Sequence, residues 1–120
     1  MKSLIHPYTL IDNTVTIGVG CPIFMRVIID PSVTIGDNCV IYLGTIIEHE
    51  IPIGNDCFIA LGVFIVVRGK INCYVFLKID SRINEKICID KDFLIRADSV
   101  MINDISPNPV VAGVPARAST

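Results

Sequence analysis

His49 is the residue whose type and setting are best suited to acid–base chemistry. It stands between two carboxylates in the segment Glu48-His49-Glu50. An imidazole titrates near neutral pH and can therefore accept the proton of an attacking amine or hydroxyl group. The alternative is a solvated surface histidine flanked by solvated acids. The second histidine, His6, directly precedes Pro7 and is expected to have a structural role.

The five cysteines are expected to be reduced thiols. Cys21, Cys39 and Cys57 are spaced by eighteen residues. In the fold inferred below, this spacing stacks them in one column at the strand spacing of ~4.8 Å, whereas a disulfide needs Cβ atoms ~3.8 Å apart. The sequence contains no Cys-x-x-Cys motif and no set of ligands in register, so we expect no metal site.

An aliphatic residue recurs at every sixth position, and this period predicts the fold. A helix or an ordinary strand has no period of six. A triangular coil does: each side takes one hexad, three hexads make a turn of eighteen residues, and the aliphatic residue of each side points to the axis. The pattern therefore predicts a parallel β-helix, an all-β solenoid. The sixteen inward positions are Ile5, Ile11, Ile17, Ile23, Ile29, Ile35, Ile41, Ile47, Ile53, Ile59, Ile65, Ile71, Leu77, Ile83, Ile89 and Ile95.

One corner of the predicted coil has a recurrent turn residue. Gly18, Gly36 and Gly54 each follow an inward isoleucine, and Asn72 and Asp90 hold the same position in later coils. Gly, Asn and Asp tolerate left-handed backbone better than other residues. We therefore expect a left-handed conformation at these five positions.

The six-residue pattern runs from Ile5 to Ile95, about five coils. Beyond Ile95 the frame is expected to shift at Met101 and Ile102, and three prolines then end the coil. The sequence predicts a solenoid over residues 1–102 and an extended C-terminal segment over residues 103–120, with no second domain.

Composition excludes several classes of function. The chain has 120 residues, 52% of them hydrophobic, a net charge of −2 and a mean hydropathy of +0.63. The densest apolar run, 57–67, is too short for a bilayer span of ~20 residues, so no membrane partner is expected. Without a basic patch, nucleic acid is not an expected partner either. The N-terminus lacks the apolar stretch of a signal peptide, which favours a cytoplasmic protein.

Three segments fit the pattern of a known group of enzymes: residues 33–39 (Val-Thr-Ile-Gly-Asp-Asn-Cys), 46–50 (Ile-Ile-Glu-His-Glu) and 111–117 (Val-Ala-Gly-Val-Pro-Ala-Arg). With the hexad, they make the chain resemble the left-handed β-helix acyltransferases. The Glu-His-Glu placement and the Gly-x-Pro-Ala-basic ending are typical of the sialic-acid O-acetyltransferases and UDP-4-amino-sugar N-acetyltransferases. The resemblance covers the whole chain.

The resemblance implies an acetyl-CoA-dependent acetyltransferase that works as a homotrimer, with three sites in the grooves between left-handed prisms. The acceptor, most simply an amino-sugar nucleotide, would attack the thioester directly, with His49 as general base and Glu50 orienting the imidazole. The reaction needs no covalent intermediate and no metal, so none of the cysteines is required as a nucleophile.

The resemblance also implies residues along the coenzyme. Gly62 and the backbone near Val67 would lie beside the pantetheine arm. The residues near the adenine and phosphates would be Gly113, Pro115, Ala116 and Arg117. Two alternatives remain open: Gly62 as a corner glycine, and Arg117 as a solvated charge near the chain end.

The chain departs from the family at four positions where glycine is usual, namely Val67, Lys78, Arg96 and Asp98. Side chains there could narrow the coenzyme groove, or Lys78 and Arg96 could contact phosphates. The family usually also has an N-terminal sugar-nucleotide domain, whereas this sequence begins at the solenoid, so it is either one domain of a longer protein or recognises its acceptor in a reduced or different way. The missing glycines favour a catalytically reduced trimeric scaffold as the alternative function, whereas the intact segment 47–50 favours the enzyme. A carbonic anhydrase on the same fold needs three histidines, and the chain has two.

Overall fold

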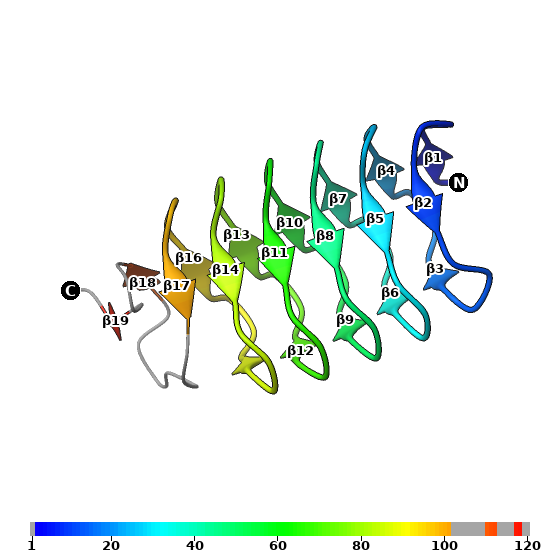
Figure 1. Cartoon of the computed structure of the whole chain (residues 1–120). Coiled ribbons are helices and arrows are strands. Elements are labelled where there is room, and N and C mark those ends of the chain that lie inside the picture. The colour runs from blue at the N-terminus through cyan, green and yellow to red at the C-terminus, as the bar shows by residue number, and fades with distance from the viewer. Residues whose placement is uncertain (1, 102–109, 113–116, 119–120) are drawn as a thin grey trace.

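The computed structural model describes residues 2–101, 110–112 and 117–118. It is an all-β parallel solenoid of about five turns, with the coils stacked along one axis (Figure 1). The described residues contain no helix long and apolar enough to cross a membrane. The predicted fold class is confirmed at this level.

Each coil adds one short strand to each of three faces. Face A consists in order of β1 (Leu4–Ile5), β4 (Pro22–Ile23), β7 (Val40–Ile41), β10 (Phe58–Ile59), β13 (Phe76–Leu77), β16 (Leu94–Ile95), β18 (Val110–Ala112) and β19 (Arg117–Ala118). Face B consists of β2 (Leu10–Ile11), β5 (Ile28–Ile29), β8 (Ile46–Ile47), β11 (Phe64–Ile65), β14 (Arg82–Ile83) and β17 (Val100–Met101). Face C consists of β3 (Thr16–Ile17), β6 (Thr34–Ile35), β9 (Pro52–Ile53), β12 (Lys70–Ile71) and β15 (Cys88–Ile89).

The strand register follows the eighteen-residue turn. Ile47 pairs with Ile29 on one side and with Ile65 on the other, and the same shift relates the strands of faces A and C. Of the C-terminal segment, β18 continues face A beside β16 in parallel, and β19 returns antiparallel to β18. The boundary at residue 102 lies at the limit of the described residues and stays a prediction.

The core is the column of inward aliphatic residues, and it departs from the prediction at both ends. Ile23 and every later member of the predicted set are buried, but Ile5 is 46% exposed and Ile11 and Ile17 are only partly buried. The first coil has no described coil beneath it, so its inward side chains are covered from one side only. At the other end, Met101 is fully buried in β17. The expected frame shift at Met101 was therefore wrong, because the six-residue pattern includes it.

The expected left-handed conformation at Gly18, Gly36 and Gly54 was also wrong, since none of these glycines has a positive φ. Glycine is needed at these positions because the coils approach each other too closely for a side chain. A Cβ atom on Gly36 would lie 2.8 Å from the carbonyl carbon of Gly54 and 2.9 Å from the amide nitrogen of Asn55. Glycine thus serves close packing of backbone on backbone at this corner.

The left-handed residue of each corner lies two positions later than expected. At the corner that follows face C, it is Gly20, Asn38, Asp56, Tyr74 and then Asp92 in successive coils. The other two corners use the same third position, with φ near +60° even at bulky residues such as Arg68. The neighbouring coils hold this backbone in place, since the Arg68 N–H donates to the His49 carbonyl one coil earlier.

Cys21, Cys39 and Cys57 stack in one inward column as free thiols, as predicted. Each thiol donates to a backbone carbonyl of the next coil; Cys57 Sγ, for example, lies 3.0 Å from the Asn72 oxygen. The hydrogen bond with Cys57, and burial, raise the pKa of the Cys39 thiol well above its ordinary value. A thiol that stays protonated in the core is a packing group and a poor nucleophile.

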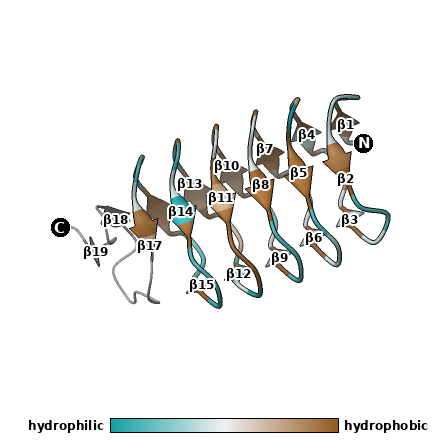
Figure 2. Cartoon of the chain, viewed as in Figure 1, coloured by the Kyte–Doolittle hydropathy of each residue, from teal (hydrophilic) through white to brown (hydrophobic). Residues whose placement is uncertain are grey.

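The three faces differ in outward polarity. The outward residues of face A are Leu4, Pro22, Val40, Phe58, Phe76 and Leu94. Those of face B are Leu10, Ile28, Ile46, Phe64, Arg82 and Val100. Those of face C are Thr16, Thr34, Pro52, Lys70 and Cys88. Faces A and B are therefore apolar apart from Arg82, which makes β14 the teal strand in Figure 2, and face C is more polar.

Candidate functional site

His49 lies on the edge between faces B and C, in the corner that joins β8 to β9. We call this edge BC; it comprises residues 12–15, 30–33, 48–51, 66–69 and 84–87. Coils on both sides fix its backbone. The Glu50 N–H donates to the Pro31 carbonyl at 3.1 Å, and the His49 carbonyl accepts from the Arg68 N–H at 3.3 Å. The half-buried side chain of His49 is thus presented at a rigid corner.

Glu50 faces a different partner from the one expected. Its backbone is left-handed, with φ +61°, and its Oε2 lies 3.6 Å from Nε of Arg68. Both side chains are more than half exposed, so this ion pair stabilises the fold little. The expected hydrogen bond from the imidazole N–H to the Glu50 carboxylate stays a prediction, and it would require the carboxylate to turn from Arg68 or to bridge both groups.

Stacking along edge BC gives His49 its neighbours. Residues eighteen apart lie one above the other at ~4.8 Å, so Pro31 precedes His49 in its column and Val67 follows it. Val67, one of the four departures from the family, is half-buried directly beside the candidate base. This corner therefore places the imidazole, the predicted proton acceptor, next to a small apolar side chain.

The structure separates the two residues expected along the pantetheine arm. Val67 lies on edge BC, whereas Gly62 lies on the edge between faces A and B, so the two flank β11 from opposite ends. Gly62 has φ +70°, and a Cβ atom there would collide with the carboxylate of Asp80. These two facts explain Gly62 as a corner glycine, and its role beside the coenzyme stays a prediction.

The remaining predicted coenzyme residues fall at the end of the chain. Gly113, Pro115 and Ala116 lie outside the described residues. Arg117 is described only as part of β19, where it pairs with Ala112. Their expected contacts with the adenine and phosphates stay predictions.

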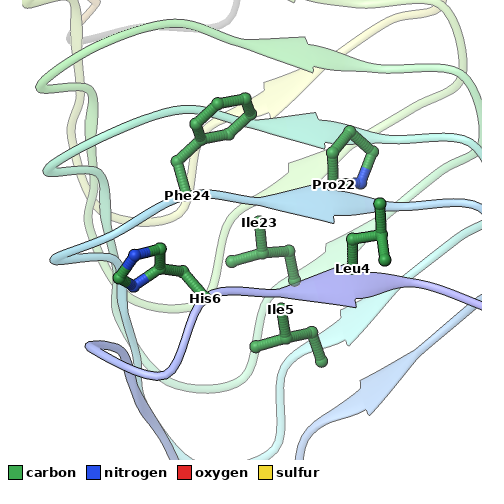
Figure 3. A pocket seen from close by; sticks show the side chains of 6 residues that line it. All are labelled: Leu4, Ile5, His6, Pro22, Ile23 and Phe24. Atoms are coloured by element: carbon green, nitrogen blue, oxygen red, sulfur yellow. The ribbon is translucent and has the colours of Figure 1, made fainter.

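Within the part of the chain that the structure describes, no group of three or more His, Cys, Asp or Glu side chains could hold a metal ion. His6 is occupied in its own corner, where its Nδ1 accepts the Tyr8 N–H at 3.0 Å. It also borders a hollow of about 340 Å³ at the open N-terminal end, lined by apolar residues that include Ile5 and Phe24 (Figure 3). His6 is thus held in its own corner, and the catalytic role of His49 stays a prediction.

One feature absent from the sequence-based prediction is a ladder of aromatic rings along face A and the adjoining corner. The ring centroids of Phe24 and Tyr42 are 4.5 Å apart, those of Tyr42 and Phe58 6.4 Å, and those of Phe58 and Phe76 4.7 Å. Two of these pairs are spaced by eighteen residues, which is the signal that could have revealed them. A second hollow, of about 330 Å³, opens beside the ladder.

The fold is shared with solved sugar N-acyltransferases. PerB from Caulobacter crescentus, in complex with CoA and GDP-perosamine, matches all of this chain with a TM-score of 0.86 and 25% identity. AntD, an N-acyltransferase from Bacillus cereus in complex with dTDP and 3-hydroxybutyryl-CoA, matches 96% of the chain and 77% of its own length, with a TM-score of 0.91 and 19% identity. The acetyltransferase domain of PglB from Neisseria gonorrhoeae matches 98% of the chain and 57% of its own length, with a TM-score of 0.67 and 18% identity.

These structures confirm the predicted resemblance to the β-solenoid sugar acyltransferases. This chain spans 58% of the PerB chain, so it corresponds to a part of that enzyme. No sequence-family model and no curated protein sequence matches this chain.

Proposed function

We propose that this chain is the solenoid of an acyl-CoA-dependent N-acyltransferase, most simply an acetyltransferase, that acts on an amino-sugar nucleotide. The observation that carries the proposal is His49, a half-buried imidazole on a corner fixed by the coils before and after it. The likeness to PerB, solved with CoA and GDP-perosamine, supports the choice of both substrates.

In the proposed reaction His49 accepts the proton of the acceptor amine as the nitrogen attacks the thioester carbonyl carbon. The C–N bond forms, the C–S bond breaks, and the imidazolium returns its proton to the leaving thiolate, so that CoA leaves as the thiol. A backbone N–H would steady the oxyanion of the tetrahedral intermediate. Glu50 would orient the imidazole, with Arg68 holding the carboxylate when the site is empty.

The proposed assembly is a homotrimer of left-handed prisms. Faces A and B are apolar and meet along edge AB, residues 6–9, 24–27, 42–45, 60–63, 78–81 and 96–99, where Leu43 and Leu61 point outward and Leu61 is 36% exposed. Phe64 continues this apolar surface over face B, and Val66 follows it at the start of edge BC. A lone prism would leave this surface in water. Three prisms that meet at Leu43 and Leu61 would bury these side chains and leave a wedge-shaped cleft between face A of one copy and face B of the next.

A catalytically reduced trimeric scaffold is the second candidate. The observation that favours it is Val67, whose side chain stands beside His49 where the family usually has glycine. If Val67 blocks the pantetheine arm, the prism would keep its fold and its assembly without binding coenzyme.

Calorimetry with acetyl-CoA, combined with light scattering on a sizing column, distinguishes the two candidates. The enzyme predicts a trimer that binds acetyl-CoA, and Val67→Gly should then bind it at least as tightly as the wild type. A trimer that gives no heat at millimolar acetyl-CoA would reject the enzyme and support the scaffold as the function. If the protein is a monomer at micromolar concentration, both the proposed trimer and the active site shared between its subunits are rejected.

A further inference from the structure

The hollow beside the aromatic ladder exists because of one small residue. The first position of each corner on edge AB is His6, Phe24, Tyr42, Ala60, Lys78 and Arg96 in successive coils. Large side chains fill this column except at Ala60, which is itself buried. The gap is the hollow of about 330 Å³, bounded by Tyr42 on one side and Lys78 on the other.

The walls of the hollow are aromatic and partly exposed. Phe58 and Phe76 stack with an interplanar angle of 27°, and Tyr42 lies tilted beside Phe58. Phe76 and Tyr42 are still 38% and 39% exposed, so ring surface remains available to a ligand. A flat ring laid on such a surface gains stacking energy whatever its hydrogen-bonding pattern.

A cation stands at the rim of this apolar hollow. Nζ of Lys78 lies 5.9 Å from the centroid of the Phe76 ring, and Arg96 follows Lys78 in the same column one coil later. Asp80 and Asp98 occupy the third, left-handed position of these corners. Lys78 lines the hollow, whereas Arg96, Asp80 and Asp98 lie outside its lining. Such a site suits a ligand with a flat ring at one end and an anionic group beside it.

We propose that this hollow binds the nucleotide part of a substrate, with the base on Phe76 and Phe58 and a phosphate at Lys78. The assignment of the source rests on the proposed function, which supplies two nucleotides: the phosphorylated adenosine of the coenzyme, and the nucleoside diphosphate of the sugar acceptor. The hollow lies where face A meets edge AB and therefore faces the proposed cleft, whereas His49 lies on edge BC. A ligand in the hollow of one copy would reach His49 of the neighbouring copy across the cleft.

The test is calorimetry of the whole chain with acetyl-CoA, dephospho-CoA, GDP and dTDP. Phe76→Leu keeps an apolar side chain on the strand but removes the ring, and it should weaken binding about 10-fold or more. Ala60→Leu should fill the hollow and abolish this binding. Lys78→Gln removes the cation at the rim and should also weaken binding. The matched control for Phe76→Leu is Tyr74→Asn, which removes an exposed ring at another corner and suits its left-handed backbone, and the control for Lys78→Gln is Lys70→Gln. Both controls should bind as the wild type.

The pattern of losses identifies the source of the nucleotide. Loss of acetyl-CoA binding in Ala60→Leu, with GDP and dTDP unaffected, assigns the hollow to the coenzyme. If Lys78→Gln also weakens the binding of acetyl-CoA more than that of dephospho-CoA, which lacks the ribose 3′-phosphate, this phosphate of the coenzyme lies at Lys78. Loss of GDP or dTDP binding alone assigns it to the acceptor.

Two outcomes overturn the inference: unchanged affinities for all four ligands in Ala60→Leu, or a Phe76→Leu variant whose oligomer dissociates while its subunits bind nucleotide normally. In the second case the ladder is a subunit contact. These results are separable from failure of the proposed function. Nucleotide binding that depends on Ala60, in a protein without transferase activity, would support the nucleotide site in the hollow and reject the proposed enzymatic function.

Discussion

Gly36 and Gly44 are glycines for different reasons. Replacing alanine by asparagine should therefore restore stability at position 44 but not at position 36. Gly36 has an ordinary backbone but touches the next coil, whereas Gly44 has φ +76° and nothing within 4 Å of a Cβ position. In Gly36→Ala the new Cβ meets backbone atoms at 2.8–2.9 Å that are held by the β-ladder. Overpacking of this kind costs about 1–3 kcal/mol. In Gly44→Ala the cost is left-handed strain, about 1–2 kcal/mol.

Asparagine separates the two causes, because it eases left-handed strain and does nothing for a clash. Gly44→Asn should recover part of the stability lost in Gly44→Ala, whereas Gly36→Asn should be no more stable than Gly36→Ala. Thermal unfolding followed by circular dichroism, at one protein concentration throughout, should show midpoints lowered by roughly 4 °C per kcal/mol. The reasoning would be refuted by Gly36→Asn melting clearly above Gly36→Ala, since that result would return Gly36 to a left-handed role.

Three further results are expected. Ile53→Asp places a carboxylate in the core between coils and should abolish folding, so a soluble variant that melts cooperatively would contradict the solenoid core. Leu61→Arg should shift the light-scattering mass from trimer toward monomer, and an unchanged trimer would place the interface elsewhere. Asp12 accepts hydrogen bonds from the backbone N–H and hydroxyl of Thr14, which lower its pKa from 3.8. The charged form thus favours the fold above the unfolded pKa, and this stability is lost as the pH falls through the lower folded pKa. In urea unfolding from about pH 5 to about pH 3, the wild type should therefore lose more stability than Asp12→Asn, and equal losses would deny the hydrogen bonds any role.

The fold was predictable because the inward-facing residues recur with the period of the coil. A six-residue spacing of aliphatic side chains fits a three-sided coil, and it places Ile47 beside Ile29 and Ile65 without further information. The ends were less predictable, because burial there depends on a neighbouring coil. Ile5 obeys the pattern and is nevertheless exposed. Gly36 was misread because sequence reveals a glycine but not which of its two uses, conformation or close approach, applies.

The candidate site was predicted residue by residue, but its contacts were not. His49 stood out by type and by its flanking acids, and the solenoid places it on a corner. Glu50 and Arg68 are eighteen residues apart, so the period that predicted the fold also predicts that they are neighbours. The sequence analysis instead paired Glu50 with His49, the residue next to it in the chain. The hollow at Ala60 could not be predicted, because it arises from a small side chain between large neighbours in a column.

Turnover of the His49→Ala variant tests the central claim most directly. With acetyl-CoA and an amino-sugar nucleotide as substrates, we expect kcat to fall by ~10²–10⁴-fold with acetyl-CoA affinity and thermal midpoint nearly unchanged, because a general base acts in the transition state. His6→Ala, at the chain's other histidine, is the matched control and should keep wild-type turnover. Turnover in His49→Ala equal to that of the wild type would contradict the account, since the base would then lie elsewhere.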